Sequence, residues 1–320
     1  MGWKGTMRSM QAASRKAARE AERRHKAAMK QQALDDAAYA VDAWENYISN
    51  LISVHVDLAD AIDWERLSTK NKPPAPKRSS KLEKQAQEKL EKFKPRIFDF
   101  LSGGSEKKRL RLTEKVREAF NLDEESFKKE ELKHTAKLEE WKADVKMANR
   151  LMDRDVEAIK EVLQNFQNIS KEDRIGTEVR FKIEKDKIHA IPNVHTDEIV
   201  PDYRRKLRAS GTLSETKMPK GQFNELYQDY VASVALKVAG DLFHVLPYNE
   251  VYVTCQASML NKSTGHKEPT PILSVHFVKE TFKTLNLQKI DPSDSLANFN
   301  HSMKFRKTTG FQKIDPLTEV

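Results

Sequence analysis

The sequence predicts an α+β protein in which a helical N-terminal half precedes a small antiparallel-sheet domain. Apolar residues recur at spacings of three and four through much of residues 34–168, which is typical of amphipathic helices. In residues 179–191 the apolar residues alternate instead, as in strands with one buried face. Hydrophobic residues make up 38% of the chain and charged residues 33%, a balance that favours long helices with exposed faces over one globule.

We expect three parts: a basic helical arm in residues 1–33, a helical bundle or coiled coil in 34–168, and an α+β domain in 175–320. No apolar run approaches the roughly 18 residues that a membrane-spanning helix needs, so no integral membrane segment is expected. Cys255 is the one cysteine of the sequence. Because a single thiol forms no intramolecular disulfide, a reducing, cytoplasmic location is expected.

The net charge of +9 comes from the first third of the sequence. Residues 1–34 hold nine Lys and Arg against two Glu, residues 35–65 hold eight acids and no base, and residues 66–118 hold seventeen bases against seven acids. Residues 119–320 are therefore neutral overall. We expect part of the second basic block to lie against the acidic segment, because opposite charges relieve the self-repulsion of both.

The first basic block is rich in helix-forming residues but has almost no large apolar side chain, so this arm is expected to project or fray. A projecting basic helix can follow a phosphate backbone without reading the base sequence. The residues expected to bind nucleic acid are Arg15, Lys16, Arg19, Arg23, Arg24 and Lys26. The alternative interpretation is a solvated helix without a partner.

An apolar seam from Leu34 to Ile62, with spacings of three and four, predicts a helix packed in a bundle or coiled coil. Either the chain's own helices or a second copy could fill this seam. His55 lies within it and is expected to be a core histidine with a hydrogen-bond partner. The prolines of residues 68–80 then end the helix and indicate a linker.

Three more helices are expected before residue 168. Ser80 and Glu83 have the spacing of a capping box, which predicts that a helix begins there. A further helix should run through residues 110–120, and a long one should begin near Asp123 and extend toward Phe166.

The C-terminal part predicts the order strand, strand, helix, strand, strand, a ββαββ arrangement with the helix across one face of the sheet. Tyr227 and Tyr230 match the packing stripe of that helix and are expected in the core. The pentapeptide QKIDP occurs at 288–292 and 312–316. We interpret the first copy as a strand end running into a helix start, and the second as the same step from a strand to Asp-Pro near the end of the sequence, that is, as local architecture rather than a paired site.

Motifs for nucleotide binding, zinc proteases and serine hydrolases are absent, so no cofactor or metal is expected. On the hairpin of residues 251–278, alternation places Tyr252, Thr254, Gln256, Ser274 and His276 on one polar face. The weak catalytic candidates, on and near this face, are His276, His266, Glu225 and Asp229. A half-exposed sheet face explains the same alternation without catalysis, and Cys255 is interpreted as a small buried hydrophobe.

These observations favour a non-enzymatic interaction or scaffold protein. Its basic arm would contact nucleic acid through phosphates, and its α+β domain would mediate assembly with a protein partner or a second copy. The first alternative is a hydrolase, a phosphodiesterase or nuclease, with its site in residues 175–320. The second is peripheral association of the arm with an anionic membrane, although the arm lacks the large apolar face that interfacial helices use.

Overall fold

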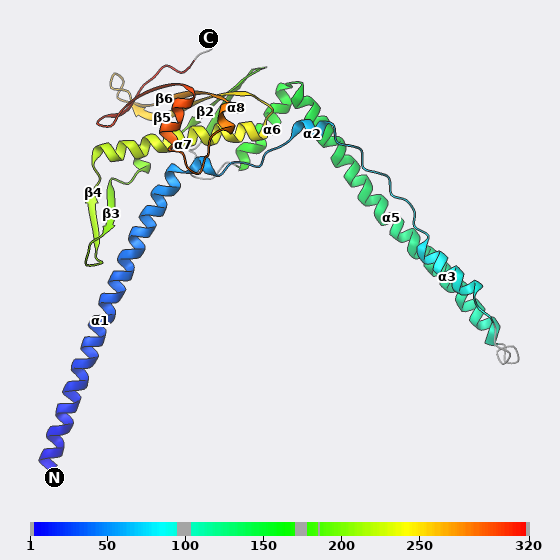
Figure 1. Cartoon of the computed structure of the whole chain (residues 1–320), viewed down its shortest axis with the longest axis horizontal. Coiled ribbons are helices and arrows are strands. Elements are labelled where there is room, and N and C mark those ends of the chain that lie inside the picture. Colours follow the sequence, from blue (N-terminus) through cyan, green and yellow to red (C-terminus); the bar gives the residue numbers. More distant parts are fainter. Residues whose placement is uncertain (1–2, 95–103, 170–177, 185, 318–320) are drawn as a thin grey trace. The chain divides into compact units, whose positions relative to one another are not determined.

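The computed structural model describes the backbone of residues 3–94, 104–169, 178–184 and 186–317, and the side chains of residues 15–164 and 178–317 within those ranges. The chain divides into two compact units, residues 1–62 with 159–320 and residues 63–158. The predicted α+β class is confirmed, because long helices precede a domain of mostly antiparallel strands (Figure 1). Residues 34–62, expected in a bundle with residues 63–168, instead belong with the sheet domain.

The first unit contains one long helix, a sheet and several short helices. Its helices are α1 (Trp3–Ile52), η1 (Val54–Val56), most of α6 (Val156–Ile169), η2 (Asp197–Ile199), α7 (Lys220–Val245), α8 (Lys279–Lys283), α9 (Pro292–Ser295) and η3 (Leu296–Asn298). Its strands are β1 (Glu178–Ile183), β2 (Ile188–Asn193), β3 (Tyr203–Leu207), β4 (Leu213–Lys217), β5 (Glu250–Leu260), β6 (Lys267–Val278), β7 (Asn300–Arg306) and β8 (Gly310–Gln312).

Six strands form the main sheet in the order β1-β2-β5-β6-β7-β8. Its neighbours are antiparallel except β2 and β5, which run parallel with Ala190 opposite Val253. The expectation of a purely antiparallel sheet is therefore wrong at this pair, because the chain returns through α7 and a crossover of that kind joins parallel neighbours. The predicted ββαββ order is present as β1, β2, α7, β5 and β6. The separate β3–β4 hairpin was not predicted.

Helix α7 lies at the centre of the first unit and is buried on nearly all sides from Tyr230 to Phe243. One side faces the sheet, where the Cys255 thiol lies 3.8 Å from the carbonyl oxygen of Val231. Tyr227 and Tyr230 are buried, so their interpretation as core residues is confirmed. Cys255 is fully buried, and burial raises the pKa of its thiol, which fits the predicted inert hydrophobe.

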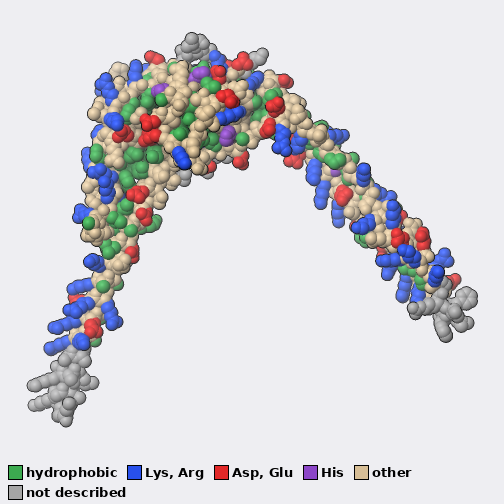
Figure 2. Space-filling view, in the orientation of Figure 1, with side chains coloured by type: hydrophobic (Ala, Val, Ile, Leu, Met, Phe, Trp, Pro, Cys, Tyr) green, Lys and Arg blue, Asp and Glu red, His purple; other side chains and the backbone are tan. Residues whose placement is uncertain are grey.

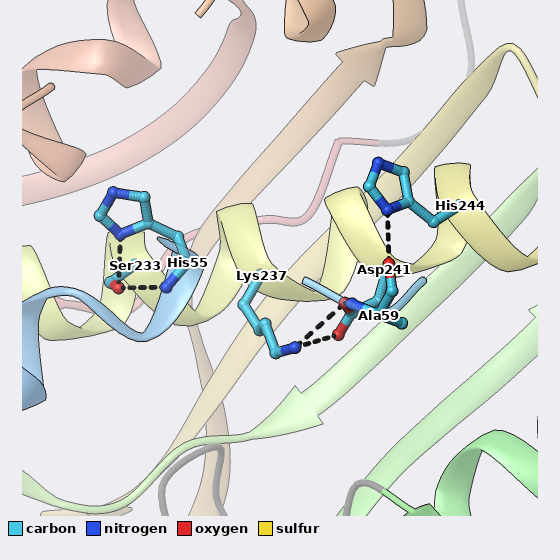
Figure 3. Close-up of polar contacts among 6 residues, drawn as sticks. All are labelled: His55, Ala59, Ser233, Lys237, Asp241 and His244. Atoms are coloured by element: carbon cyan, nitrogen blue, oxygen red, sulfur yellow. Dashed lines mark hydrogen bonds and ion pairs between the residues drawn. The ribbon is translucent and has the colours of Figure 1, made fainter. Parts of the chain in front are cut away.

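Residues 53–62, which we call the strap, run along another side of α7 from Ser233 to His244 (Figure 3). The hydroxyl of Ser233 accepts from the His55 backbone N–H at 3.1 Å and bonds Nδ1 of its ring at 2.8 Å. Further along α7, the Asp241 carboxylate accepts from the Ala59 N–H at 2.7 Å, and Nδ1 of His244 donates to the Ala59 carbonyl at 2.6 Å. The strap thus binds α7 through its backbone polar groups.

This strap confirms one expectation and corrects another. His55 is buried with partners at both ring nitrogens, the second being the Leu287 carbonyl at 3.0 Å, so it is the predicted core histidine. Burial holds its pKa below the ordinary value. The predicted helix as far as Ile62 is wrong beyond Ile52, because the next backbone groups bond to α7 side chains instead of continuing the helix.

The apolar seam of α1 packs against the β3–β4 hairpin and α7. Ala37, Val41 and Leu51 are buried along it. The Trp44 indole N–H donates to the Tyr203 carbonyl at 3.1 Å and ties α1 to the base of the hairpin. Elements of the same chain therefore fill the seam that the sequence assigned to a helical bundle or coiled coil.

The second unit contains α2 (Trp64–Ser68), α3 (Lys81–Glu91) and α5 (Gly104–Met152). The two helices predicted on either side of residue 123 are one continuous helix, α5, which ends at a turn where Arg154 has a φ of 60°. The predicted helix toward Phe166 is therefore interrupted. The proline-rich linker runs along α5, and the Trp141 indole N–H donates to the Lys70 carbonyl at 2.7 Å.

The start of α3 is capped from α5 rather than by its own capping box. The buried Asp123 carboxylate accepts from the backbone N–H groups of Leu82 and Glu83, each at 3.0 Å. The Ser80 side chain makes no capping hydrogen bond, so the predicted box is wrong. A carboxylate already aimed at the free N–H groups of the first turn performs the same task.

The two QKIDP copies differ in what precedes them. In the first, Asp291 caps α9 by accepting from the Asp294 N–H at 3.0 Å, as predicted, but residues 288–290 form a turn rather than a strand end. In the second, β8 leads into Ile314, whose N–H donates to the Pro271 carbonyl at 3.1 Å. The first copy therefore acts locally as a helix cap, whereas the second joins a distant strand, β6.

Candidate functional site

The leading candidate site is a row of bases on α1, the basic ridge, made of Arg15, Lys16, Arg19, Arg23, Lys26 and Lys30. All six side chains are exposed, and Figure 2 shows Lys and Arg side chains along this part of the helix. At 3.6 residues per turn they lie within roughly a third of the helix circumference, along about 22 Å of its length. Arg24, the remaining predicted base, is exposed but lies outside the ridge.

The ridge continues the line of the apolar seam. Lys30, Leu34 and Ala37 follow one another at spacings of four and three, which keeps them on one side of a helix. The same side of α1 is therefore apolar where it packs on the sheet domain and basic where the helix extends beyond that domain. Because the packed half is tied at Trp44, the direction in which the ridge points is set by the fold.

The charges of the ridge remain exposed. Within the described part of the chain, Lys26 of the ridge pairs with Glu22 at 2.6 Å. An exposed ion pair at this helical spacing contributes only about 0.3–0.5 kcal/mol to stability. The acidic residues of 35–52 lie further along the same continuous helix, so they cannot fold back over the ridge. Arg15, Arg19 and Arg23 repel one another at spacings of four, and an anionic partner would relieve that repulsion.

The second basic block pairs with acids other than those of residues 35–65. In the second unit, Arg78 pairs with Glu124 at 2.8 Å and Lys70 with Asp144 at 3.2 Å. These contacts use carboxylates of α5, so part of this block's positive charge is compensated locally.

The polar face predicted on the β5–β6 hairpin exists only in part. Tyr252 and His276 stack on it with ring centroids 4.4 Å apart, and Nε2 of His276 lies 3.0 Å from a Glu250 carboxylate oxygen. Thr254 and Ser274 are buried. The C-terminal segment contacts Ser274, whose hydroxyl accepts from the Leu317 N–H at 3.1 Å.

A chain of hydrogen bonds crosses the buried part of that face. Nε2 of His189 lies 2.7 Å from the Thr254 hydroxyl, which lies 2.8 Å from the Ser274 hydroxyl. A hydroxyl beside a histidine is the beginning of a nucleophile and base pair. Thr254 is only 1% exposed, so substrate has no access to it, and among the described residues no carboxylate is recorded on the His189 ring. This chain of contacts satisfies buried polar groups.

The four catalytic candidates do not form one site. His276 lies on the open face of the sheet, whereas Glu225 and Asp229 lie on α7, which covers the opposite face. His266 lies in the loop before β6, and His276 follows Lys267, the first residue of β6, by nine positions, about 30 Å at ~3.3 Å per residue. Glu225 pairs with Lys307. The sheet therefore separates groups that a hydrolase would need together.

Asp229 gives a stability prediction. Burial and the nearby Asp291, Asp294 and Glu225 raise its pKa from 3.8 to about 6, while a hydrogen bond from Ser293 opposes the shift. Because the pKa of Asp229 is higher in the folded protein than in the unfolded chain, the protonated carboxyl favours the folded state at low pH. This contribution to the free energy of unfolding is lost as the pH rises through about 6. Because the carboxylate is partly solvated, screening reduces this linked free energy to about 1 kcal/mol.

We therefore expect Asp229→Asn to increase the free energy of unfolding by about 1 kcal/mol at pH 7 and by almost nothing near pH 4. Urea unfolding of the wild type and the variant at several pH values measures the difference. The contributions of the other titrating groups to the free energy of unfolding cancel, because both proteins contain these groups. A variant that is less stable at pH 7 would instead give the ionised carboxylate a stabilising role.

A cavity of about 260 Å³ lies between η2, the beginning of α7, the end of β5 with the beginning of β6, and β8. Asp197, Glu198, Lys220 and Lys267 are its charged residues, and none of the four catalytic candidates lines it. Across the described residues, no group of three or more His, Cys, Asp or Glu side chains is arranged to hold a metal ion. No helix in the described ranges has the length and apolar character required to cross a bilayer.

Comparison of the chain with protein families, curated proteins and solved structures found no match. Sequence reasoning missed Lys30 of the ridge, although its spacing from Lys26 was visible. It also missed the bases of the β3–β4 hairpin, because the neutral sum over residues 119–320 concealed the local run YRRKLR.

Proposed function

We propose that this protein is a non-enzymatic nucleic-acid-binding protein whose basic ridge contacts the phosphate backbone. The observation that carries the proposal is the arrangement of six exposed bases on one side of a helix whose other half is anchored to the sheet domain. Lys and Arg side chains on phosphates give affinity by releasing condensed counterions, without reading base sequence.

The other functions expected from the sequence gain less support. A hydrolase would need its candidate groups in one place, and they lie on opposite faces of the sheet. An interfacial membrane helix needs a large apolar face opposite its bases, and the side of the arm away from the ridge carries Ala17, Ala21 and Ala28. No observation on the described residues favours assembly through the α+β domain, so the proposal is confined to the arm.

The salt dependence of binding tests the proposal. Phosphate contacts by the six ridge bases predict that log Kobs falls against log salt concentration with a slope of about −5 or steeper. Fluorescence anisotropy of a labelled oligonucleotide with the full chain at several salt concentrations measures this slope. Affinity that does not change with salt would contradict the proposal, and equal binding to phosphatidylserine vesicles would favour the membrane alternative.

A further inference from the structure

The β3–β4 hairpin carries a second group of bases. Its first strand and turn read Tyr-Arg-Arg-Lys-Leu-Arg over residues 203–208. Arg205 is engaged inside the hairpin, where it pairs with Glu215 at 2.9 Å and lies over the Tyr203 ring at 4.9 Å. Lys206 and Arg208 are exposed, and no ion pair is recorded for either of them among the described residues. Unlike Arg205, these two bases have no ion pair within the described residues of the hairpin, so their charges are exposed to an external partner.

The hairpin lies beside α1, and both of its strands contact that helix (Figure 1). Its base is tied by the Trp44 hydrogen bond to Tyr203. Its turn approaches Leu34 at Gly211, where φ is +79° and an added Cβ atom would lie 2.9 Å from a Leu34 methyl carbon. Only glycine combines that backbone conformation with so close an approach, so the position of the turn against α1 is specific.

This contact brings the two basic groups together. The Gly211 N–H donates to the Arg208 carbonyl at 2.8 Å within the turn, so Arg208 is part of the segment that touches Leu34. Lys30, the last base of the ridge, precedes Leu34 by one helical turn, about 6 Å of rise. Because Leu34 lies on the same side of α1 as the ridge, the hairpin turn that carries Arg208 borders the end of the ridge, and Lys206 lies two residues before Arg208 in the chain.

We propose that the basic ridge and the hairpin bases Lys206 and Arg208 form one composite site for double-helical DNA. In this arrangement α1 lies in the major groove and the hairpin turn binds the phosphate backbone that borders it. The inference rests on the proposed function and deepens it, since it names the class of nucleic acid and a second contacting element.

Two physical arguments favour a DNA duplex over a single strand or an RNA duplex. Sites for single strands depend on aromatic side chains that stack on bases, and residues 15–33 contain no Phe, Trp or Tyr. An α-helix with its side chains is about 10–12 Å wide and fits the major groove of B-form DNA, about 12 Å wide. The major groove of an RNA duplex is too deep and narrow for it.

The test compares full-length variants on three probes of one sequence: a 20-base-pair DNA duplex, the matching RNA duplex and the single DNA strand. The hairpin variant is Lys206→Gln with Arg208→Gln. Its control, Lys262→Gln with Lys289→Gln, removes the same charge from exposed positions elsewhere in the first unit. In about 0.1 M salt we expect the hairpin variant to bind duplex DNA roughly 30-fold more weakly and its salt slope to lose about 2, with the control unchanged.

The remaining outcomes separate the two proposals. If the hairpin variant binds duplex DNA like its control, while variants with ridge bases replaced by glutamine bind weakly, the composite site is overturned and the proposed function stands. If ridge variants also bind like wild type, both are overturned. Single-strand affinity that falls as much as duplex affinity, or equal wild-type affinity for the RNA duplex, overturns the assignment to the DNA major groove. Circular dichroism and the urea midpoint of each variant verify that its fold is intact.

Discussion

Replacing Arg15, Arg19, Arg23 and Lys26 by glutamine should reduce affinity for nucleic acid by at least about 100-fold in 0.1 M salt. Each base on a phosphate contributes about 0.9 to the slope of log Kobs against log salt concentration, so the slope should lose three to four units. The substitutions touch no buried group, because these side chains are exposed, and glutamine keeps good helix propensity. Anisotropy titrations of the full-length variant at several salt concentrations measure both quantities.

The matched control replaces four exposed lysines of α5 by glutamine, at Lys128, Lys129, Lys133 and Lys137, and so removes the same charge. The control should keep nearly wild-type affinity, because net charge alone acts only through the screened long-range field. A chain truncated to residues 34–320 should bind as weakly as the ridge variant. If the α5 control loses as much affinity as the ridge variant, binding depends on total charge and the ridge is not a site.

Ser233→Ala should destabilise the first unit by about 2–4 kcal/mol. The Ser233 side chain is fully buried and supplies partners to both the backbone N–H and Nδ1 of His55. Alanine leaves these two groups in a buried site, and each unsatisfied group costs about 1–3 kcal/mol. Equilibrium unfolding in urea, followed by far-ultraviolet circular dichroism, measures the loss, which should appear as a lower midpoint.

The control for this variant is Ser258→Ala, on an exposed position of β5, which should change stability by less than about 0.5 kcal/mol. If the two variants are equally stable, the strap does not depend on Ser233. Affinity for nucleic acid should be unchanged in Ser233→Ala at temperatures where it is folded, because the ridge side chains are exposed and contact neither the strap nor α7. Loss of stability and loss of binding would thus be separated.

Much of the fold could be predicted because it depends on local patterns. The alternation over residues 179–183 and the apolar stripe of residues 223–242 predict a strand and a helix, and both form where expected, although α7 is buried on nearly all sides instead of along one face. The errors occur where a distant group replaces a local one. Asp123 caps α3 in place of Ser80, and Ser233 and Asp241 bind the chain after Ile52 where helix was expected. The spacing of residues in the sequence does not reveal hydrogen-bond partners that lie 40 or more residues apart.

The candidate site shows the same division. The run of bases identified five of the six ridge residues, but it also included Arg24 and omitted Lys30, because only the helical spacing shows which bases share one side of α1. Sequence reasoning did not identify Lys206 and Arg208, because their proximity to α1 depends on the contact of Gly211 with Leu34. For the same reason it grouped His276 with Glu225 and Asp229, which the sheet keeps apart.

The sequence by itself determined the α+β class, the basic helix and the line of residues that changes from basic to apolar along α1. These follow from charge and periodicity, which are properties of neighbouring residues. Only the tertiary structure decided that the seam packs on a hairpin of the same chain and that a second basic element borders the ridge. Those features depend on which distant surfaces bury apolar area together, and adjacent residues do not encode that choice.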